Sequence, residues 1–265
     1  MTERIRVELK AGVADVRLVR ADKMNALDDA MFSALIETGE QLKRETGVRA
    51  VVLSGEGRAF CAGLDTSNFA GMAGGRRSDG LVETPRTPGG ANRAQQAVMV
   101  WREVPVPVIA AVHGVAFGGG FQLALGADMR FVAADARLSV MEIKWGLVPD
   151  MAGMVLLRGL VRDDQFRELT FTGRVFDGAE ALTLGIATRL SADPHAEALA
   201  CAADIAAKSP DAIRAAKRLL NMPPSATVAE VLLAESVEQT ALIGSANQVE
   251  AVMANLEKRA PLFRD

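Results

Sequence analysis

The feature that most restricts the fold of this chain is a change of hydrophobic period that recurs along its first two-thirds. Residues 5–19 alternate apolar and polar side chains on both sides of Ala11-Gly12, a pattern typical of a β-hairpin. A helical period follows at 31–42, and the apolar run 50–53 then predicts a buried strand. Strands that alternate with helices form parallel sheets through right-handed crossovers, so we expect an α/β fold.

The alternation continues beyond a segment that has no period. Residues 70–90 are rich in Gly, Pro and Arg, and we expect them to form a mobile loop or a lid. After them, the pattern predicts a helix at 91–102, a strand at 106–112, a helix at 121–126 and a strand at 129–133. The sheet is therefore expected to grow strand by strand across most of the chain.

The last third of the chain has only helical periodicity. The sequence divides into a core at 1–195 and a helical region at 196–265, whose amphipathic helices pack either on their own core or against other subunits. The predicted helices from residue 151 onward are 151–160, 163–172, 178–184, 194–208, 211–220, 227–242 and 246–259.

Composition excludes several classes of protein. The 30 Lys and Arg residues nearly balance the 33 Asp and Glu residues among 265, a net charge of −3 that offers no basic surface to nucleic acid. The uncharged stretch 104–127 is long enough to cross a bilayer, but prolines and glycines interrupt it, so no membrane segment is expected. Two distant cysteines and a charged N-terminus favour a reducing compartment, and we expect a cytoplasmic protein.

A run of three glycines, Gly118-Gly119-Gly120, stands between a predicted strand and a predicted helix. It matches neither GxxxxGK[ST] nor GxGxxG, so nucleotide hydrolysis and dinucleotide binding have little support. The run does expose backbone N–H groups at a helix N-terminus, where they can stabilise a negatively charged oxygen. The alternative is that three glycines merely allow a tight turn and close packing.

Among the side chains, carboxylates are the best candidates for chemistry. We interpret His113 and His195 as structural and Cys61 as a small buried residue, and we find no pattern of metal ligands. Glu142 lies in an apolar run, where desolvation would raise its pKa toward that of a useful general base. Asp150 follows eight residues later. The alternative for both carboxylates is a helix cap or a salt bridge.

Three strings of sequence together resemble a known family. Residues 23–27 read KMNAL, residues 57–65 read GRAFCAGLD, and residues 109–120 read IAAVHGVAFGGG. They resemble the crotonase superfamily, the enoyl-CoA hydratase/isomerase family, and the resemblance extends from about residue 5 to about residue 260. It implies a spiral of ββα units with a helical C-terminal region, and a homotrimer or a dimer of trimers. It also implies an acyl-CoA thioester substrate, with coenzyme A carried by the substrate and no separate cofactor.

The resemblance assigns roles to particular residues. The backbone N–H groups of Leu64 and Gly119 would form an oxyanion hole for the thioester carbonyl. The backbone of Ala62, Leu64, Asp65 and Thr66 would hold the adenine and pantetheine parts of coenzyme A, and Lys23 could meet its phosphates.

The chain departs from the family's hydratases at one catalytic position. Hydratases of the family use two glutamates, but here Gln122 occupies the first position and Glu142 the second. Because an amide cannot exchange a proton at physiological pH, we expect hydration to be slow. Isomerases of the family use the second glutamate alone. Dienoyl-CoA isomerases have an aspartate where Asp150 stands, but they also have an acid where Gln122 stands, so this match is partial. We therefore expect double-bond isomerisation of an enoyl- or dienoyl-CoA, the alternatives being slow hydration and a non-catalytic acyl-CoA-binding or RNA-binding homologue.

Overall fold

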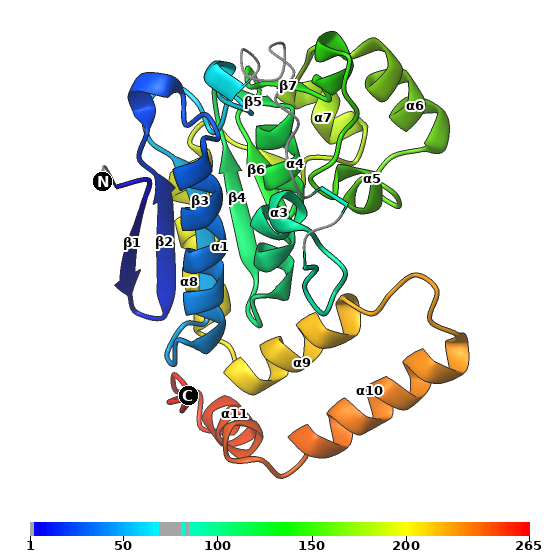
Figure 1. The fold of residues 1–265 in the computed structure, drawn as a ribbon. Coiled ribbons are helices and arrows are strands. Elements are labelled where there is room, and N and C mark those ends of the chain that lie inside the picture. Colours follow the sequence, from blue (N-terminus) through cyan, green and yellow to red (C-terminus); the bar gives the residue numbers. More distant parts are fainter. Residues whose placement is uncertain (1–2, 69–80, 83–84) are drawn as a thin grey trace.

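The fold of the chain, seen in a computed structural model, is built on two sheets with helices packed around them (Figure 1). The structure describes residues 3–68, 81–82 and 85–265. The expectation for 70–90 therefore falls largely outside the described residues. The larger sheet has six strands in the order β1-β2-β3-β4-β6-β9, and the smaller has three in the order β5-β7-β8. The strands are β1 Ile5–Lys10, β2 Val13–Leu18, β3 Ala50–Gly55, β4 Val108–Val112, β5 Val115–Phe117, β6 Met129–Val132, β7 Arg137–Ser139, β8 Phe176–Asp177 and β9 Arg189–Leu190.

Within the larger sheet β1 pairs antiparallel with β2, whereas β2, β3, β4, β6 and β9 run parallel to one another. The helices that connect and cover the strands are η1 Ala21–Lys23, α1 Asp29–Arg44, α3 Arg93–Glu103, α4 Gly119–Leu125, η2 Glu142–Trp145, α5 Gly153–Leu156, α6 Asp163–Thr172, α7 Gly178–Thr183, α8 Pro194–Ala206, α9 Pro210–Leu220, α10 Val228–Leu242 and α11 Ala246–Leu256. The predicted hairpin and most of the predicted longer helices are confirmed, and so is the α/β class.

The larger sheet packs between two layers of apolar side chains. Helices α1 and α3 cover one face, and α8 covers the other (Figure 1). Ala198, Ala202 and Ala206 recur every four residues on α8, so this helix can approach β3 and β4 closely. Both faces of these strands are therefore buried, which explains why β3 and β4 consist of nearly continuous apolar residues.

A strand of the larger sheet is followed twice by a strand of the smaller sheet and then by a helix. The chain turns at Gly114, whose φ of +62° suits glycine, and passes from β4 to β5 and then into α4. The succession β6, β7 and η2 repeats this course. Because each unit advances the chain by one parallel strand, the loops that end the smaller sheet lie together, and the Gly118 turn comes next to Glu142. This is the repeated ββα unit that the resemblance implied.

The prediction of a helix at 151–160 is wrong, since α5 spans only Gly153–Leu156. Ala152 has a left-handed conformation with φ +70°, which stops a helix from beginning earlier. The backbone N–H groups on either side of Ala152 donate instead to the side chain of Gln122.

None of the helices in the described part of the chain is long and apolar enough to cross a membrane.

Candidate active site

The segment that carries Leu64 is held by an isolated parallel β-bridge between Leu64 and Leu27, just before α1. The N–H of Leu27 donates to the carbonyl of Gly63 at 2.8 Å, and the N–H of Asp65 donates to the carbonyl of Leu27 at 3.0 Å. In a parallel ladder, consecutive residues direct their N–H groups to opposite sides. The N–H of Leu64 therefore points away from Leu27.

A second backbone N–H comes from the first residue of α4. Gly63 packs against the β5–α4 turn so closely that a Cβ on it would lie 2.4 Å from the carbonyl oxygen of Phe117 and 3.5 Å from the nitrogen of Gly119. Within the described part of the chain, neither Leu64 nor Gly119 donates its backbone N–H to another group. Two unpaired donors on adjoining segments are the arrangement that an oxyanion hole requires.

Gln122 and Glu142 are in direct contact. The amide nitrogen of Gln122 donates to Oε1 of Glu142 at 2.7 Å. The amide oxygen of Gln122 accepts hydrogen bonds of 2.9 Å from the backbone nitrogens of both Met151 and Gly153. Because two fixed N–H donors hold that oxygen, the NH₂ group must face Glu142. Gln122 is only 1% exposed, so this orientation cannot easily change.

The second oxygen of Glu142 is available for chemistry. Oε2 is buried and has no hydrogen-bond partner among the described residues. Burial raises the pKa of Glu142, and the charge of Asp150 raises it further, while the hydrogen bond from Gln122 acts in the opposite direction. A Cβ on Gly118 would lie 3.2 Å from Oε1, so the carboxylate stands beside the turn that leads into Gly119. A buried, unpaired carboxylate oxygen with a raised pKa is suited to accept a proton.

Asp150 lies farther toward solvent. Its side chain is exposed, yet neighbouring protein atoms displace enough water to raise the pKa of its carboxyl group. It makes no direct hydrogen bond to Glu142 in the structure, and it affects that residue through charge. The predicted trio of Gln122, Glu142 and Asp150 is thus assembled at one place, although only the first two are in contact.

The residues expected to bind coenzyme A differ in how they are presented. Lys23 ends η1 and is exposed, as is Thr66. Ala62 is partly buried and donates its N–H to the carbonyl of Met24, the residue after Lys23, at 2.9 Å. Asp65 turns its carboxylate into the protein, where it is 8% exposed. Lys23 and Thr66 therefore have side chains free to reach a ligand, whereas Asp65 could contribute only backbone atoms.

The other sequence candidates have structural environments. Burial raises the pKa of the Cys61 thiol to about 12, which removes it as a nucleophile at neutral pH. His113 contacts the carbonyl of Gly57 at 2.9 Å, and His195 contacts Asp15 at 3.0 Å. No three His, Cys, Asp or Glu side chains within the described ranges gather closely enough to hold a metal ion.

Sequence reasoning missed two parts of this site. The backbone donors of Met151 and Gly153 have no sequence signature, because any residue supplies an N–H. Arg20 was also missed, although it binds Asp65 at 2.6 Å. Its only signal is its place, three residues before the KMNAL string and two residues after the end of the buried strand β2.

Comparison with known proteins gives a consistent result. The family model for enoyl-CoA hydratase/isomerase matches residues 8–265. A Bacillus subtilis protein named "Probable enoyl-CoA hydratase" is 33% identical over 244 residues, covering 91% of each chain. The human mitochondrial Delta(3,5)-Delta(2,4)-dienoyl-CoA isomerase is 32% identical over 252 residues, which cover 93% of this chain and 77% of that one.

The fold agrees with these relationships. The crystal structure of enoyl-CoA hydratase from Bacillus anthracis superposes with a TM-score of 0.89 at 27% sequence identity, covering 98% of this chain and 99% of that one. The likeness includes the spiral core and the helical C-terminal region, because it extends over nearly the full length of both chains. This chain belongs to the enoyl-CoA hydratase/isomerase family.

Proposed function

We propose that this enzyme moves a carbon–carbon double bond along the acyl chain of an enoyl-CoA thioester, with Glu142 as the only proton carrier. The observation that supports this most directly is the contact of Gln122 with Glu142 at 2.7 Å. Gln122 fills the position of a second acid with a group that cannot gain or lose a proton at physiological pH. Isomerisation needs a single carboxylate, because the proton that leaves one carbon returns to another.

In this proposal, Oε2 of Glu142 removes a proton from C2 of a 3-enoyl-CoA. The C–H electrons form a C1–C2 π bond, the carbonyl π electrons move to the oxygen, and the C3–C4 double bond becomes conjugated with the new C1–C2 bond, so a dienolate forms with its charge on the carbonyl oxygen. The N–H groups of Leu64 and Gly119 would stabilise that oxygen, and one such donor is typically worth about 3 kcal/mol. The protonated Glu142 then returns its proton to C4, which leaves the double bond between C2 and C3. No atom or electron is gained overall, so the reaction requires no redox cofactor.

A second candidate gives Asp150 a direct role. In a 3,5-dienoyl-CoA, the proton can be returned at C6, too far along the chain for the group that took it from C2. Asp150 has a raised pKa and stands near enough to Glu142 to influence its titration, so it could supply that distant proton. The human relative named as a dienoyl-CoA isomerase favours this candidate.

Hydration of a 2-enoyl-CoA is less well supported. Addition of water needs one group to take a proton from the water and another to deliver a proton to C2. Both acceptor positions of the Gln122 oxygen are occupied by the N–H groups of Met151 and Gly153. We therefore expect hydration to be slower than isomerisation by about 100-fold or more, the usual contribution of one general acid or base.

The test is an assay of the purified protein with 2-enoyl-, 3-enoyl- and 3,5-dienoyl-CoA thioesters, followed by ultraviolet absorbance and mass. Migration of the double bond without a change of mass, lost in Glu142→Gln, is the expected result. Rapid gain of one water by 2-enoyl-CoA would contradict the proposal. Binding of all three thioesters without exchange of the C2 proton for deuterium would instead identify a non-catalytic acyl-CoA-binding protein.

We also propose that copies of this chain associate through the C-terminal helices. Helix α10 packs mainly on α9 and has no buried residue, although apolar side chains are spread around it. Val228, Leu232, Leu233 and Val237 are between 56% and 76% exposed. A helix that is apolar on several sides is normally covered, and a second copy of the chain would cover it in a trimer or a dimer of trimers.

A further inference from the structure

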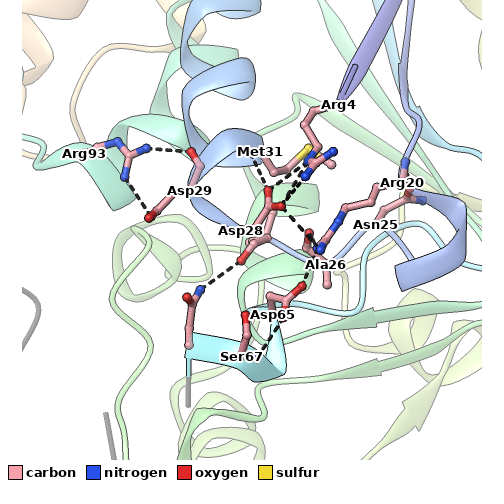
Figure 2. Close-up of polar contacts among 12 residues, drawn as sticks. Arg4, Arg20, Asn25, Ala26, Asp28, Asp29, Met31, Asp65, Ser67 and Arg93 are labelled. Atoms are coloured by element: carbon pink, nitrogen blue, oxygen red, sulfur yellow. Dashed lines mark hydrogen bonds and ion pairs between the residues drawn. The ribbon is translucent and has the colours of Figure 1, made fainter. Parts of the chain in front are cut away.

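A network of ion pairs lies directly behind the segment that carries Leu64. It joins four side chains: Arg4, which precedes β1, Arg20 in the loop after β2, Asp28 at the N-cap of α1, and Asp65, which follows Leu64 (Figure 2). None of these side chains reaches the Gln122–Glu142 pair through a hydrogen bond. The network therefore contacts the segments beside Leu64 and not the proton carrier.

Asp65 is the member of the network closest in sequence to the oxyanion donor. Its Oδ2 accepts a hydrogen bond of 2.6 Å from Nη1 of Arg20, and its Oδ1 accepts from the backbone nitrogen and the hydroxyl of Ser67. These contacts lower the pKa of Asp65 to about 2, those from Ser67 contributing most and that from Arg20 next. Asp65 is thus ionised throughout the working pH range, and among the described residues Arg20 is the cation that forms an ion pair with it.

Arg20 ties Asp65 to the segment that pairs with Leu64. Nη1 of Arg20 also donates to the carbonyl of Ala26 at 3.0 Å, and Nη2 lies 3.5 Å from Oδ2 of Asp28. The side chain is 15% exposed, so these contacts are largely protected from water. Ala26 precedes Leu27, whose N–H and carbonyl form the two hydrogen bonds of the bridge to Gly63 and Asp65. Arg20 therefore contacts both of the segments that this bridge joins, and the Leu64 N–H projects from one of them.

Asp28 depends much less on Arg20. Nη2 of Arg4 donates to its Oδ2 at 2.6 Å, Nε of Arg4 contacts both of its oxygens, and the backbone nitrogen of Met31 donates to Oδ1. Loss of Arg20 would leave Asp28 with these partners. The distinctive contact of Arg20 is therefore the one with Asp65.

We infer that Arg20 is a positioning residue which, through Asp65, directs the N–H of Leu64 at the carbonyl oxygen of the bound thioester. The inference rests on the proposed oxyanion hole. A hydrogen bond to a developing oxyanion depends steeply on distance and angle, so a small rotation of the Leu64 peptide costs rate while the fold survives.

The experiment compares Arg20→Met with Arg4→Met. Both variants remove a partly buried arginine that contacts Asp28, but only Arg20→Met removes the contact with Asp65. The first measurement is the infrared stretching frequency of the thioester carbonyl in bound 2,4-dienoyl-CoA labelled with carbon-13. Hydrogen bonds to that oxygen lower the frequency relative to free ligand, and a residue with a purely structural role would not alter the shift.

We expect Arg20→Met to lose a large part of the downshift and to lower kcat by about 10- to 100-fold, with a much smaller change in KM. Arg4→Met should keep both at the native values. Asp65→Asn should reproduce the Arg20→Met result, and the double variant should be no worse than either single one, since the two residues act through one contact. Arg20→Lys should restore part of the shift, because a single ammonium can reach Asp65 without the other contacts.

The outcomes separate this inference from the proposed function. A full downshift in Arg20→Met, or equal effects of Arg20→Met and Arg4→Met, would overturn the role of Arg20 and leave the oxyanion hole intact. No downshift in the unmodified protein would overturn the oxyanion hole itself. If Arg20→Met fails to fold, the carbonyl stretching frequency is measured in Asp65→Asn and Arg20→Lys instead. A native frequency in both variants would refute the role of Arg20.

Discussion

At the scale of single residues, the side chain at position 122 sets the charge of the site. In Gln122→Glu, one carboxylate oxygen would remain on the N–H groups of Met151 and Gly153, and the other would stand about where the amide nitrogen now lies, 2.7 Å from Glu142. Two carboxylates so close cannot both ionise, and they share a proton. We predict that the acid limb of the pH–rate profile moves to higher pH and that hydration of 2-enoyl-CoA increases.

Gln122→Asn is the matched control for this substitution, because it changes the side chain without adding an acid. It should lower isomerisation by loosening Glu142, and it should leave hydration where it was. The hypothesis that Gln122 limits hydration fails if Gln122→Glu folds and still hydrates no faster than the unmodified protein.

The charge of Asp150 should be visible in the titration of Glu142. As a base, Glu142 acts only when ionised, so the rate must rise with pH through its pKa. That pKa is raised by burial and by Asp150, and the acid limb therefore lies above the ordinary glutamate value of about 4.3. Removal of the negative charge in Asp150→Asn should move the limb to lower pH, measured as kcat/KM for 3-enoyl-CoA. An unchanged limb would show that Asp150 does not influence the base.

Sequence reasoning reached these residues but not their orientation. The resemblance to the family was enough to place Gln122 and Glu142 at the two catalytic positions of one site, but it did not predict their direct contact. Which end of the amide faces the carboxylate depends on two backbone N–H groups about thirty residues later, and on the left-handed turn at Ala152 between them. A pattern of side-chain types carries no information about such contacts.

At the scale of elements, the hydrophobic period of the sequence predicted the long helices and strands, but it did not predict the short ones. The hairpin of β1 and β2 and the helices α1, α6 and α9 bury or expose enough residues for a period to be visible. Strands β5, β7, β8 and β9 have two or three residues each, fewer than a pattern needs. Pairing with distant neighbours defines them, which is why the smaller sheet was not predicted.

Helix α9 carries a buried lysine that binds the core, and this gives a prediction about stability. Nζ of Lys217 donates to the carbonyl of Val106 at 2.8 Å and to Asp128 at 2.7 Å, and the side chain is 6% exposed. Lys217→Met would leave the Val106 carbonyl and Asp128 without their cationic donor, so we expect a loss of about 2 kcal/mol in the free energy of unfolding.

Urea denaturation followed by circular dichroism measures this loss. The neighbouring Arg218 supplies a control, since its ion pair with Glu238 joins α9 to α10 at a position where the arginine is 58% exposed. Arg218→Met should change the free energy of unfolding by less than about 1 kcal/mol. Equal losses in the two variants would mean that the buried position of Lys217 gives it no special importance.

At the scale of the whole molecule, apolar exposure is uneven. The larger sheet is covered by apolar side chains on both faces, whereas α10 and α11 lie below the sheet in Figure 1. On these two helices Leu232, Leu233, Val252 and Leu256 are exposed. The sequence predicted these helices but left open whether they pack on their own core or on other subunits. The structure places α10 against α9 without burying any residue of α10, so its apolar side chains remain available to another chain.

If a second copy covers α10, a charge placed on it should separate the subunits. We predict that Leu233→Asp lowers the molar mass measured by multi-angle light scattering to that of a single chain, because an ionised carboxylate cannot be buried in an apolar contact without a large cost. Gln239→Asp adds the same charge to an exposed polar position of the same helix and should leave the assembly intact. Since a partner that binds only folded chains stabilises them by mass action, the melting temperature of the unmodified protein should also rise with its concentration, and that of Leu233→Asp should not. Equal masses for the two variants would show that α10 lies outside the contact between copies.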